Sequence, residues 1–295
     1  MIMRILFIGT VEFSLQALEK LIDIKSDIVG VCTKEVSSFN SDFADLVPLC
    51  KRNEIPFKYI DDINSKENIA WIRAVNPDII FCFGWSSLIK KELLKMPSMG
   101  IIGYHPAKLP QNRGRHPLIW ALVLGLRESA STFFFMREGA DDGDILSQMD
   151  FEILYEDDAS SVYEKVIAIA LKQIEDFVPK LQKSTYQRIP QDHTQSNVWR
   201  KRGMRDGLID FRMSSDAIYN LVRGLSKPYV GAHIEYGDEN ISVWKVEEVV
   251  CAQVNLEPGK VLESDISTIV VKCYTNAIKI LEHDFKVLPK VGEYL

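Results

Sequence analysis

The sequence predicts an α/β fold in which a doubly wound, mostly parallel sheet is followed by a smaller, β-rich C-terminal domain. Short apolar runs alternate with segments of helical periodicity in the first half of the chain, and this alternation indicates crossover connections between parallel strands. A long amphipathic segment at 160–181 would close that domain against its sheet. Several short strand candidates follow it, which indicates a small barrel or an open sheet.

The expected elements follow one another in a regular order. A strand at 4–9 leads into a helix at 12–22, because Phe13, Ala17 and Leu21 recur at helical spacing. The remaining elements of the first domain are a strand at 27–33, helices at 44–52 and 68–75, a strand at 77–84, a helix at 87–96, strands at 100–105 and 131–136, and a helix at 116–125. Those of the second domain are a helix at 215–225 and strands at 231–236, 241–249, 267–274 and 277–283. The expected boundaries are 1–188 for the first domain, 189–205 for a polar linker and 206–295 for the second domain.

Composition and charge limit the class of partner. The chain has 295 residues, a formal net charge of −6 and a pI near 5.5. This balance disfavours a nucleic-acid partner, because such binding depends on Lys and Arg displacing counterions. No run approaches the roughly 18 apolar residues that cross a bilayer, and the N-terminus leads into a strand without a signal-type region. We therefore expect a cytoplasmic protein that does not contact a membrane.

The cysteines point to burial and away from metal binding. They are odd in number and widely spaced, at Cys32, Cys50, Cys82, Cys251 and Cys273. Most of them lie in apolar stretches, which is typical of buried thiols. The sequence holds no CxxC, HExxH or clustered His and Cys residues, so we expect no metal site.

The ligand site should lie beyond the carboxyl ends of the parallel strands, where the loops face a shared crevice. The loops there begin at Gly9 and Thr10, at Trp85 and at His105. No GxGxxG follows the first strand and no GxxxxGK[ST] occurs, so neither dinucleotide binding nor P-loop chemistry is supported.

The segment GYHPAKLPQNRGRHP, at 103–117, is the densest group of unusual residues. Its prolines fix the backbone, and Gly114 permits a tight turn. His105 lies at the end of a strand, where its imidazole can exchange a proton near neutral pH. Arg113 has two open roles: it fixes this loop or it reaches a phosphate.

A second polar group, MREGADDGDIL at 136–146, contains three acids within four residues. They are Asp141, Asp142 and Asp144. Because their charges repel one another, a loop around a functional group is expected here. A carboxylate beside His105 would orient its ring and stabilise the imidazolium, which makes the pair a candidate general base.

Four stretches, ILFIGTVEF, GIIGYHPAKLPQNRG, GADDGD and DGLID, resemble the folate-dependent formyltransferases in their order and spacing. That family includes methionyl-tRNA formyltransferase and the sugar N-formyltransferases that act on nucleotide-linked amino sugars. The resemblance covers most of the chain and is strongest in the first domain. It implies a formyltransferase catalytic domain with N10-formyltetrahydrofolate as co-substrate.

The resemblance implies an Asn-x-His motif and a distant Asp. The histidine and the aspartate fall on His105 and Asp141, but the asparagine falls on Gly103. The oxygen that becomes negative during formyl transfer then needs another donor, since losing one typically costs about 100- to 1,000-fold in rate. The candidates are a backbone N–H freed by Gly103, the amide of Asn112, the hydroxyl of Ser86 or Ser87, and protonated His105.

The resemblance also implies the folate contacts, and the charge of a pyrophosphate indicates where the nucleotide sugar binds. The folate is expected at Trp85, Ser86, Leu88, Met136, Gly139, Ala140 and Asp141. The nucleotide sugar is expected at Gly9, Thr10 and Arg113, and at Arg200, Arg202 and Arg205, because a pyrophosphate needs cationic partners.

The leading hypothesis is transfer of the formyl group to the amine of a nucleotide-linked amino deoxysugar, of the kind used for surface polysaccharides or pseudaminic-type acids. The acidic charge balance favours this small-molecule partner over tRNA. Methionyl-tRNA formyltransferase, formyltetrahydrofolate hydrolase and a catalytically silent folate-binding protein are the alternatives. We expect a homodimer, because small appended β domains often pair.

Overall fold

The structure is a computed structural model that describes residues 3–37 and 41–295. The chain forms two compact units. The first consists of Met1–Gly114, Ala130–Phe151 and Lys165–Val198, and the second of Arg115–Ser129, Glu152–Glu164 and Trp199–Leu295. This grouping differs from the expected division at 1–188, 189–205 and 206–295, because two segments of the N-terminal part pack within the second unit. The expected domain boundaries, at residues 188 and 206, stay a prediction.

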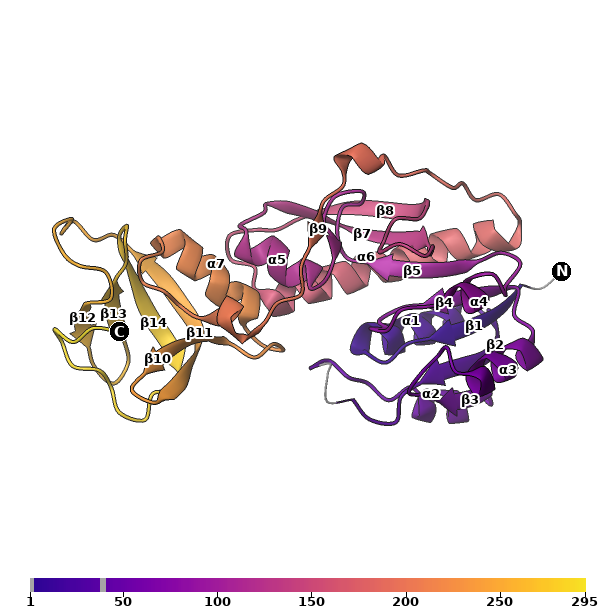
Figure 1. Cartoon of the computed structure of the whole chain (residues 1–295), viewed down its shortest axis with the longest axis horizontal. Coiled ribbons are helices and arrows are strands. Elements are labelled where there is room, and N and C mark those ends of the chain that lie inside the picture. The colour runs from indigo at the N-terminus through magenta and orange to yellow at the C-terminus, as the bar shows by residue number, and fades with distance from the viewer. Residues whose placement is uncertain (1–2, 38–40) are drawn as a thin grey trace. The chain divides into compact units, whose positions relative to one another are not determined.

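A seven-stranded sheet forms the centre of the first unit (Figure 1). Its order is β3-β2-β1-β4-β5-β7-β8. The strands are β1 (Arg4–Ile8), β2 (Asp27–Thr33), β3 (Phe57–Tyr59), β4 (Ile79–Cys82), β5 (Ile101–His105), β7 (Glu128–Phe135) and β8 (Ile145–Glu152). The first five pair in parallel, whereas β7 runs antiparallel to β5. The predicted doubly wound, mostly parallel sheet is therefore confirmed.

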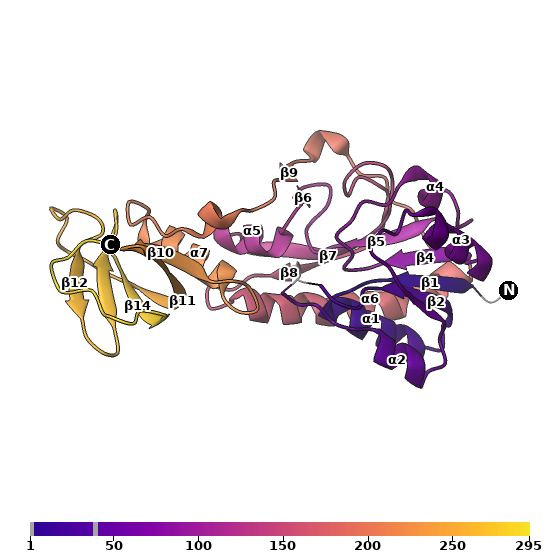
Figure 2. The ribbon, with the colours of Figure 1, turned by 60° about the horizontal axis from the view of Figure 1, so that its bottom comes forward.

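Helices cover both faces of this sheet, with α1 (Glu12–Asp23) and α6 (Ala159–Gln182) on one face and α3 (Lys66–Val75) and α4 (Lys91–Leu94) on the other (Figure 2). The helix α2 (Val47–Arg52) connects β2 to β3. Alternate residues of each strand point to opposite faces. Rings of Phe81, Phe83 and Phe133 pack against α1 and α6, whose contacting rings are Phe13 and Phe177.

The helix predicted at 87–96 is reduced to the single turn of α4. The side chain of Asn64 accounts for the late start of the helix, because it binds the Leu88 carbonyl, which a longer helix would use for itself, and the N–H of Lys90, the N-cap of α4. Its amide donates to the Leu88 carbonyl at 2.8 Å, and its oxygen accepts from the N–H of Lys90 at 2.7 Å. The loop after β4, which holds the expected folate contacts, is therefore held open as a loop.

The second unit is built on a five-stranded antiparallel sheet of order β10-β11-β14-β13-β12. Its strands are β10 (Ala232–Tyr236), β11 (Glu239–Val249), β12 (Val261–Ser264), β13 (Ile269–Lys272) and β14 (Ala277–His283). The helix α7 (Ser215–Leu225) packs on it around a core that includes Ile218, Val243 and Ile278, and α5 (Pro117–Val123) packs against α7. The short elements are β6 (Arg113–Gly114), β9 (Val198–Trp199) and two 3-10 turns at His193–Gln195 and Met204–Gly207.

The thiols behave as the sequence predicts at four of five positions. Cys32, Cys50, Cys82 and Cys273 are buried, and burial raises the pKa of each thiol to about 12. Cys251 is partly exposed. Across the described ranges, no helix combines the length and apolar character that a membrane crossing needs. Among the same residues, no group of three or more His, Cys, Asp or Glu side chains is arranged to hold a metal ion.

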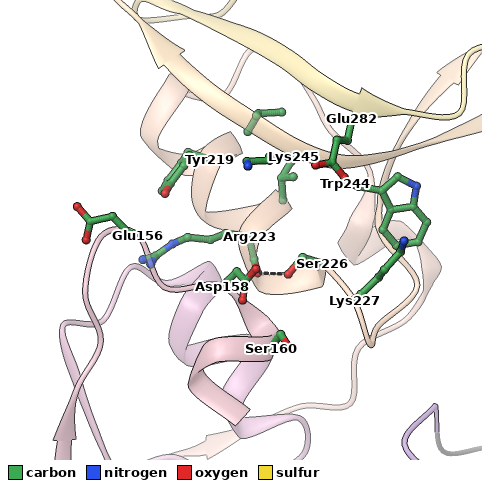
Figure 3. A pocket seen from close by; sticks show the side chains of 12 residues that line it. Glu156, Asp158, Ser160, Tyr219, Arg223, Ser226, Lys227, Trp244, Lys245 and Glu282 are labelled. Carbon is green, nitrogen blue, oxygen red and sulfur yellow. Dashed lines mark hydrogen bonds between the residues drawn. The ribbon is translucent and has the colours of Figure 1, made fainter. Parts of the chain in front are cut away.

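One arginine explains why the segment before α6 belongs to the second unit. Arg223 of α7 is buried and points toward the stretch that carries Glu156 and Asp158 (Figure 3). Its Nη1 donates to the carbonyls of Leu154, Tyr155 and Asp157 at 2.8, 3.2 and 2.9 Å. Three carbonyls, one buried and two partly buried, therefore accept from one guanidinium.

Replacing Arg223 with methionine should lower the free energy of unfolding by about 3 kcal/mol, because one buried and two partly buried carbonyls lose this donor. Urea denaturation followed by circular dichroism measures this. Arg212→Met is the matched control, since Arg212 lies on the surface and pairs only with Asp210. Equal midpoints for the two variants would contradict the assigned role of Arg223.

Candidate active site

The two predicted catalytic side chains lie next to each other in the first unit. His105 is the last residue of β5 and is 4% exposed, and Asp141 lies in the loop between β7 and β8. The distance between His105 Nδ1 and Asp141 Oδ2 is 3.6 Å. In the antiparallel pairing of β5 and β7, His105 lies opposite Thr132, and the N–H of Gly114 holds the Asp141 carboxylate near the imidazole.

The imidazole ring is oriented by a backbone carbonyl and not, as the sequence suggested, by the carboxylate. His105 Nε2 lies 2.7 Å from the carbonyl oxygen of Asn112. A carbonyl only accepts, so Nε2 carries the hydrogen and donates. In the neutral ring the lone pair is then on Nδ1, the nitrogen that faces Asp141.

A three-residue segment, 112–114, contacts both members of the pair. The Asn112 carbonyl binds His105, and the N–H of Gly114 donates to Asp141 Oδ2 at 2.9 Å. This segment is itself anchored, because Asn197 accepts from the N–H of Asn112 at 2.7 Å and from the N–H of Arg113 at 3.1 Å. The imidazole and the carboxylate are therefore fixed to the same short stretch of backbone.

The space beside Gly103 is filled by other side chains. A Cβ placed on Gly103 would lie 2.8 Å from Met136 Cγ and 3.0 Å from the ring of Phe134. An asparagine could enter only if Met136 moved. Asn112, another candidate donor, is half-buried, and within the described ranges its side-chain amide makes no hydrogen bond.

The predicted folate contacts fall in two places of the first unit. Trp85 and Met136 pack against the same apolar cluster, and Lys34 Nζ lies 5.4 Å from the Trp85 ring centroid. Ser86 and Leu88 are exposed on the loop after β4. The Trp85 indole nitrogen is buried and lacks a hydrogen-bond partner among the described residues. A flat ligand with an acceptor atom would satisfy that donor.

The loop that carries Asp141 also holds Gly139 and Ala140, both of which are exposed. A Cβ on Gly139 would lie 2.1 Å from the carboxylate of Asp142, so a larger residue here would require that side chain to move. Asp142 Oδ1 is buried and has no hydrogen-bond partner in the part of the chain described. It provides an unused acceptor in the loop next to the catalytic pair.

Gly9 and Thr10 form the tight turn between β1 and α1. A Cβ on Gly9 would lie 2.6 Å from the Phe83 carbonyl, and the buried Thr10 hydroxyl donates to the Gly84 carbonyl at 3.1 Å. These contacts explain both residues as supports of the turn. Their predicted contact with substrate stays a prediction.

Arg113 is 6% exposed, so it takes the first of its two predicted roles and fixes the loop. Its guanidinium donates to Gln191 Oε1 at 3.2 and 2.6 Å and to His193 Nδ1 at 3.1 Å. Sequence reasoning missed Gln191, which it placed in a polar linker. No local pattern distinguishes this glutamine from the exposed residues around it.

The predicted cations at 200–205 belong to the second unit. The side chain of Arg200 pairs with Asp206, whereas that of Arg202 donates to the Asp206 carbonyl and lies 4.8 Å from the Trp120 ring centroid. Arg205 is exposed. A phosphate contact by these residues stays a prediction.

The second unit also contains a cavity of about 350 Å³, shown in Figure 3. Its lining includes Tyr219, Lys227, Trp244 and Lys245. None of the predicted site residues lines this cavity, so it is separate from the pair described above.

Comparisons with known proteins show the family of this chain. The family described as formyl transferase matches residues 3–176, and the formyl transferase C-terminal domain matches residues 203–289. The methionyl-tRNA formyltransferase of Caldanaerobacter subterraneus subsp. tengcongensis is 29% identical over 300 residues, which cover 99% of this chain and 96% of that protein. The bifunctional polymyxin resistance protein ArnA of Wigglesworthia glossinidia brevipalpis is 30% identical over 234 residues. That match covers 79% of this chain, which spans only 35% of the length of that relative.

Among solved structures, an N-formyltransferase from Helicobacter canadensis in complex with folinic acid and dTDP-3-aminofucose has a similar fold. Its TM-score is 0.71 at 16% identity, over 96% of this chain and 100% of that one. Since the first family match alone spans more than half of the 295 residues, this chain belongs to the formyl transferase family.

Proposed function

We propose that this protein transfers a formyl group from N10-formyltetrahydrofolate to the amine of a nucleotide-linked amino sugar. The observation that carries the proposal is the buried His105, whose Nδ1 lone pair is left free beside the Asp141 carboxylate. A base in this position can accept a proton from an attacking amine. Family membership identifies the transferred group.

The hydrogen bonds around His105 determine which atom acts. Because Nε2 donates to the Asn112 carbonyl, Nδ1 is the atom that accepts the proton from the amine. The resulting imidazolium then faces Asp141 Oδ2 across 3.6 Å, and the opposite charges stabilise the protonated ring. The same Nδ1–H returns the proton to the leaving nitrogen.

The residues present fit the folate that the family implies. When bound, N10-formyltetrahydrofolate supplies the formyl carbon that the acceptor amine attacks. In this chain, Trp85 and Met136 would hold the flat pterin by apolar contact, and the unpaired Trp85 N–H and Asp142 Oδ1 would bind its polar edge. The exposed Leu88 would exclude water from one side of the ring.

The nature of the acceptor rests on charge and on one structural relative. A net charge of −6 disfavours the polyanion tRNA, and the Helicobacter canadensis relative was solved with dTDP-3-aminofucose. Arg202 and Arg205 are the proposed phosphate contacts. The second candidate function is formylation of methionyl-tRNA, which the 29% identity over the whole chain to a methionyl-tRNA formyltransferase favours.

A panel of acceptors tests the proposed function. The protein is incubated with N10-formyltetrahydrofolate and, separately, UDP- and dTDP-linked amino sugars or methionyl-tRNA, and mass spectrometry follows the gain of a formyl group. We expect formylation of at least one nucleotide sugar. Formylation of methionyl-tRNA alone would establish the second candidate. Formate release without any acceptor would indicate a hydrolase, and folate binding without turnover would indicate a silent binding protein.

His105→Ala and Asp141→Asn should each lower kcat by about 100-fold or more, because the first removes the base and the second removes the charge that stabilises it. Asparagine tolerates the left-handed backbone of Asp141, whose φ is +51°, so the loop is retained. Asp144→Asn is the matched control in the same loop, since Asp144 pairs with Arg137 on the surface. Near-normal turnover of both site variants would exclude this mechanism.

Asn112→Gly should lower kcat by about 100-fold if the Asn112 amide binds the developing oxyanion. Glycine accepts the φ of +62° at this position and keeps the carbonyl that orients His105, so only the side chain is lost. Asn76→Gly is the control, because Asn76 has a φ of +47° at the end of α3, far from the pair in sequence. Steady-state kinetics at saturating donor measure the effect. An unchanged kcat would mean that another candidate donor binds the oxyanion.

A further inference from the structure

The loop that carries Asp141 is strained and tightly packed, so it needs an external support. Asp141 has a φ of +51°, which few non-glycine residues adopt. Gly143 leaves no room for a side chain, because a Cβ there would lie 1.6 Å from the Phe135 carbonyl. The carbonyls of Asp141 and Gly143 have the same partner, the side chain of Gln191.

Gln191 holds this loop with its amide group. It is 7% exposed, and its Nε2 donates to the Asp141 carbonyl at 2.8 Å and to the Gly143 carbonyl at 2.6 Å. Its Oε1 accepts twice from the guanidinium of Arg113. The carbonyls can only accept and the guanidinium can only donate, so these partners fix the orientation of the amide.

Arg113 connects Gln191 to the segment that holds His105. Its neighbours in the chain are Asn112, whose carbonyl binds the imidazole, and Gly114, whose N–H binds the Asp141 carboxylate. The Asp141 backbone is thus held through Gln191, and its side chain through Gly114. Both supports depend on residues 112–114, because Arg113 holds Gln191 and Gly114 binds the carboxylate directly.

We infer that Gln191, held by Arg113, is a positioning residue that sets the distance between the Asp141 carboxylate and the His105 imidazole. This inference rests on the proposed function, because it concerns the same catalytic pair. Gln191 donates to the carbonyls of Asp141 and Gly143, so it acts through the loop backbone. Displacing a reacting group by about 1 Å can cost on the order of 100-fold in rate.

The test compares two buried glutamines of the first unit. Gln191→Leu removes both donors to the Asp141 loop, and Gln173→Leu is the matched control. Gln173 is 1% exposed on α6, and its Nε2 also makes two hydrogen bonds, to the Ser131 carbonyl and the Ser147 hydroxyl. Both variants should lose similar thermal stability. We expect kcat to fall about tenfold or more in Gln191→Leu, with KM for the formyl donor within twofold, and to stay within twofold in Gln173→Leu.

A second variant and a crystal structure distinguish the loss of support for the Asp141 loop from a general loss of stability. Gln191→Glu keeps the acceptor for Arg113 but lacks the amide N–H groups, so it should show the same loss of kcat while folding normally. A crystal structure of either Gln191 variant should show the Asp141 carboxylate moved by about 1 Å or more relative to His105. Equal kcat in the Gln191 and Gln173 variants, or an unmoved carboxylate, would overturn the inference. A wild-type protein that formylates no acceptor would instead refute the proposed function, while the crystal structure would still decide the role of Gln191.

Discussion

The site depends on one short stretch of backbone. Residues 112–114 give a carbonyl to the His105 imidazole and an N–H to the Asp141 carboxylate. Both contacts come from the main chain, so they do not depend on the side chains of Asn112 and Gly114, whereas the backbone of the Asp141 loop is held by the Gln191 side chain. What the side chains contribute is the immobility of this stretch, through Asn197 on one side and Arg113 on the other.

Much of the fold follows from local pattern. Apolar runs such as that of β4 alternate with amphipathic helices, and a sheet covered on both faces is the only arrangement that buries all of them. The pattern fails where one distant side chain competes with local propensity. At 87–96 the residues favour a helix, but Asn64 occupies the backbone groups of Leu88 and Lys90. The strands β3, β8 and β12 were also missed. Runs of three and four residues give too little periodicity in β3 and β12, and β8 buries only its first residue and Phe151.

The sequence indicates the chemistry of the site better than it indicates what supports that chemistry. His105 and Asp141 could be found because each follows an apolar strand and carries a titratable group. Gln191 could not, because its importance comes from partners 50 and 78 residues away. The role of Arg113 likewise became clear only from its burial. The tautomer of His105 depends on a carbonyl, which every residue possesses and no sequence can single out.

The Met136 side chain fills the space beside Gly103, and this affects how related chains can be recognised from their sequences. The Met136 side chain lies where the amide that the family pattern leads one to expect would begin, so an asparagine at 103 requires Met136 to move or to be replaced. A search that demands the asparagine would pass over this chain although the imidazole and the carboxylate are both in place. Relatives with the same replacement are better sought by a bulky residue at the position of Met136, directly after the FFF run.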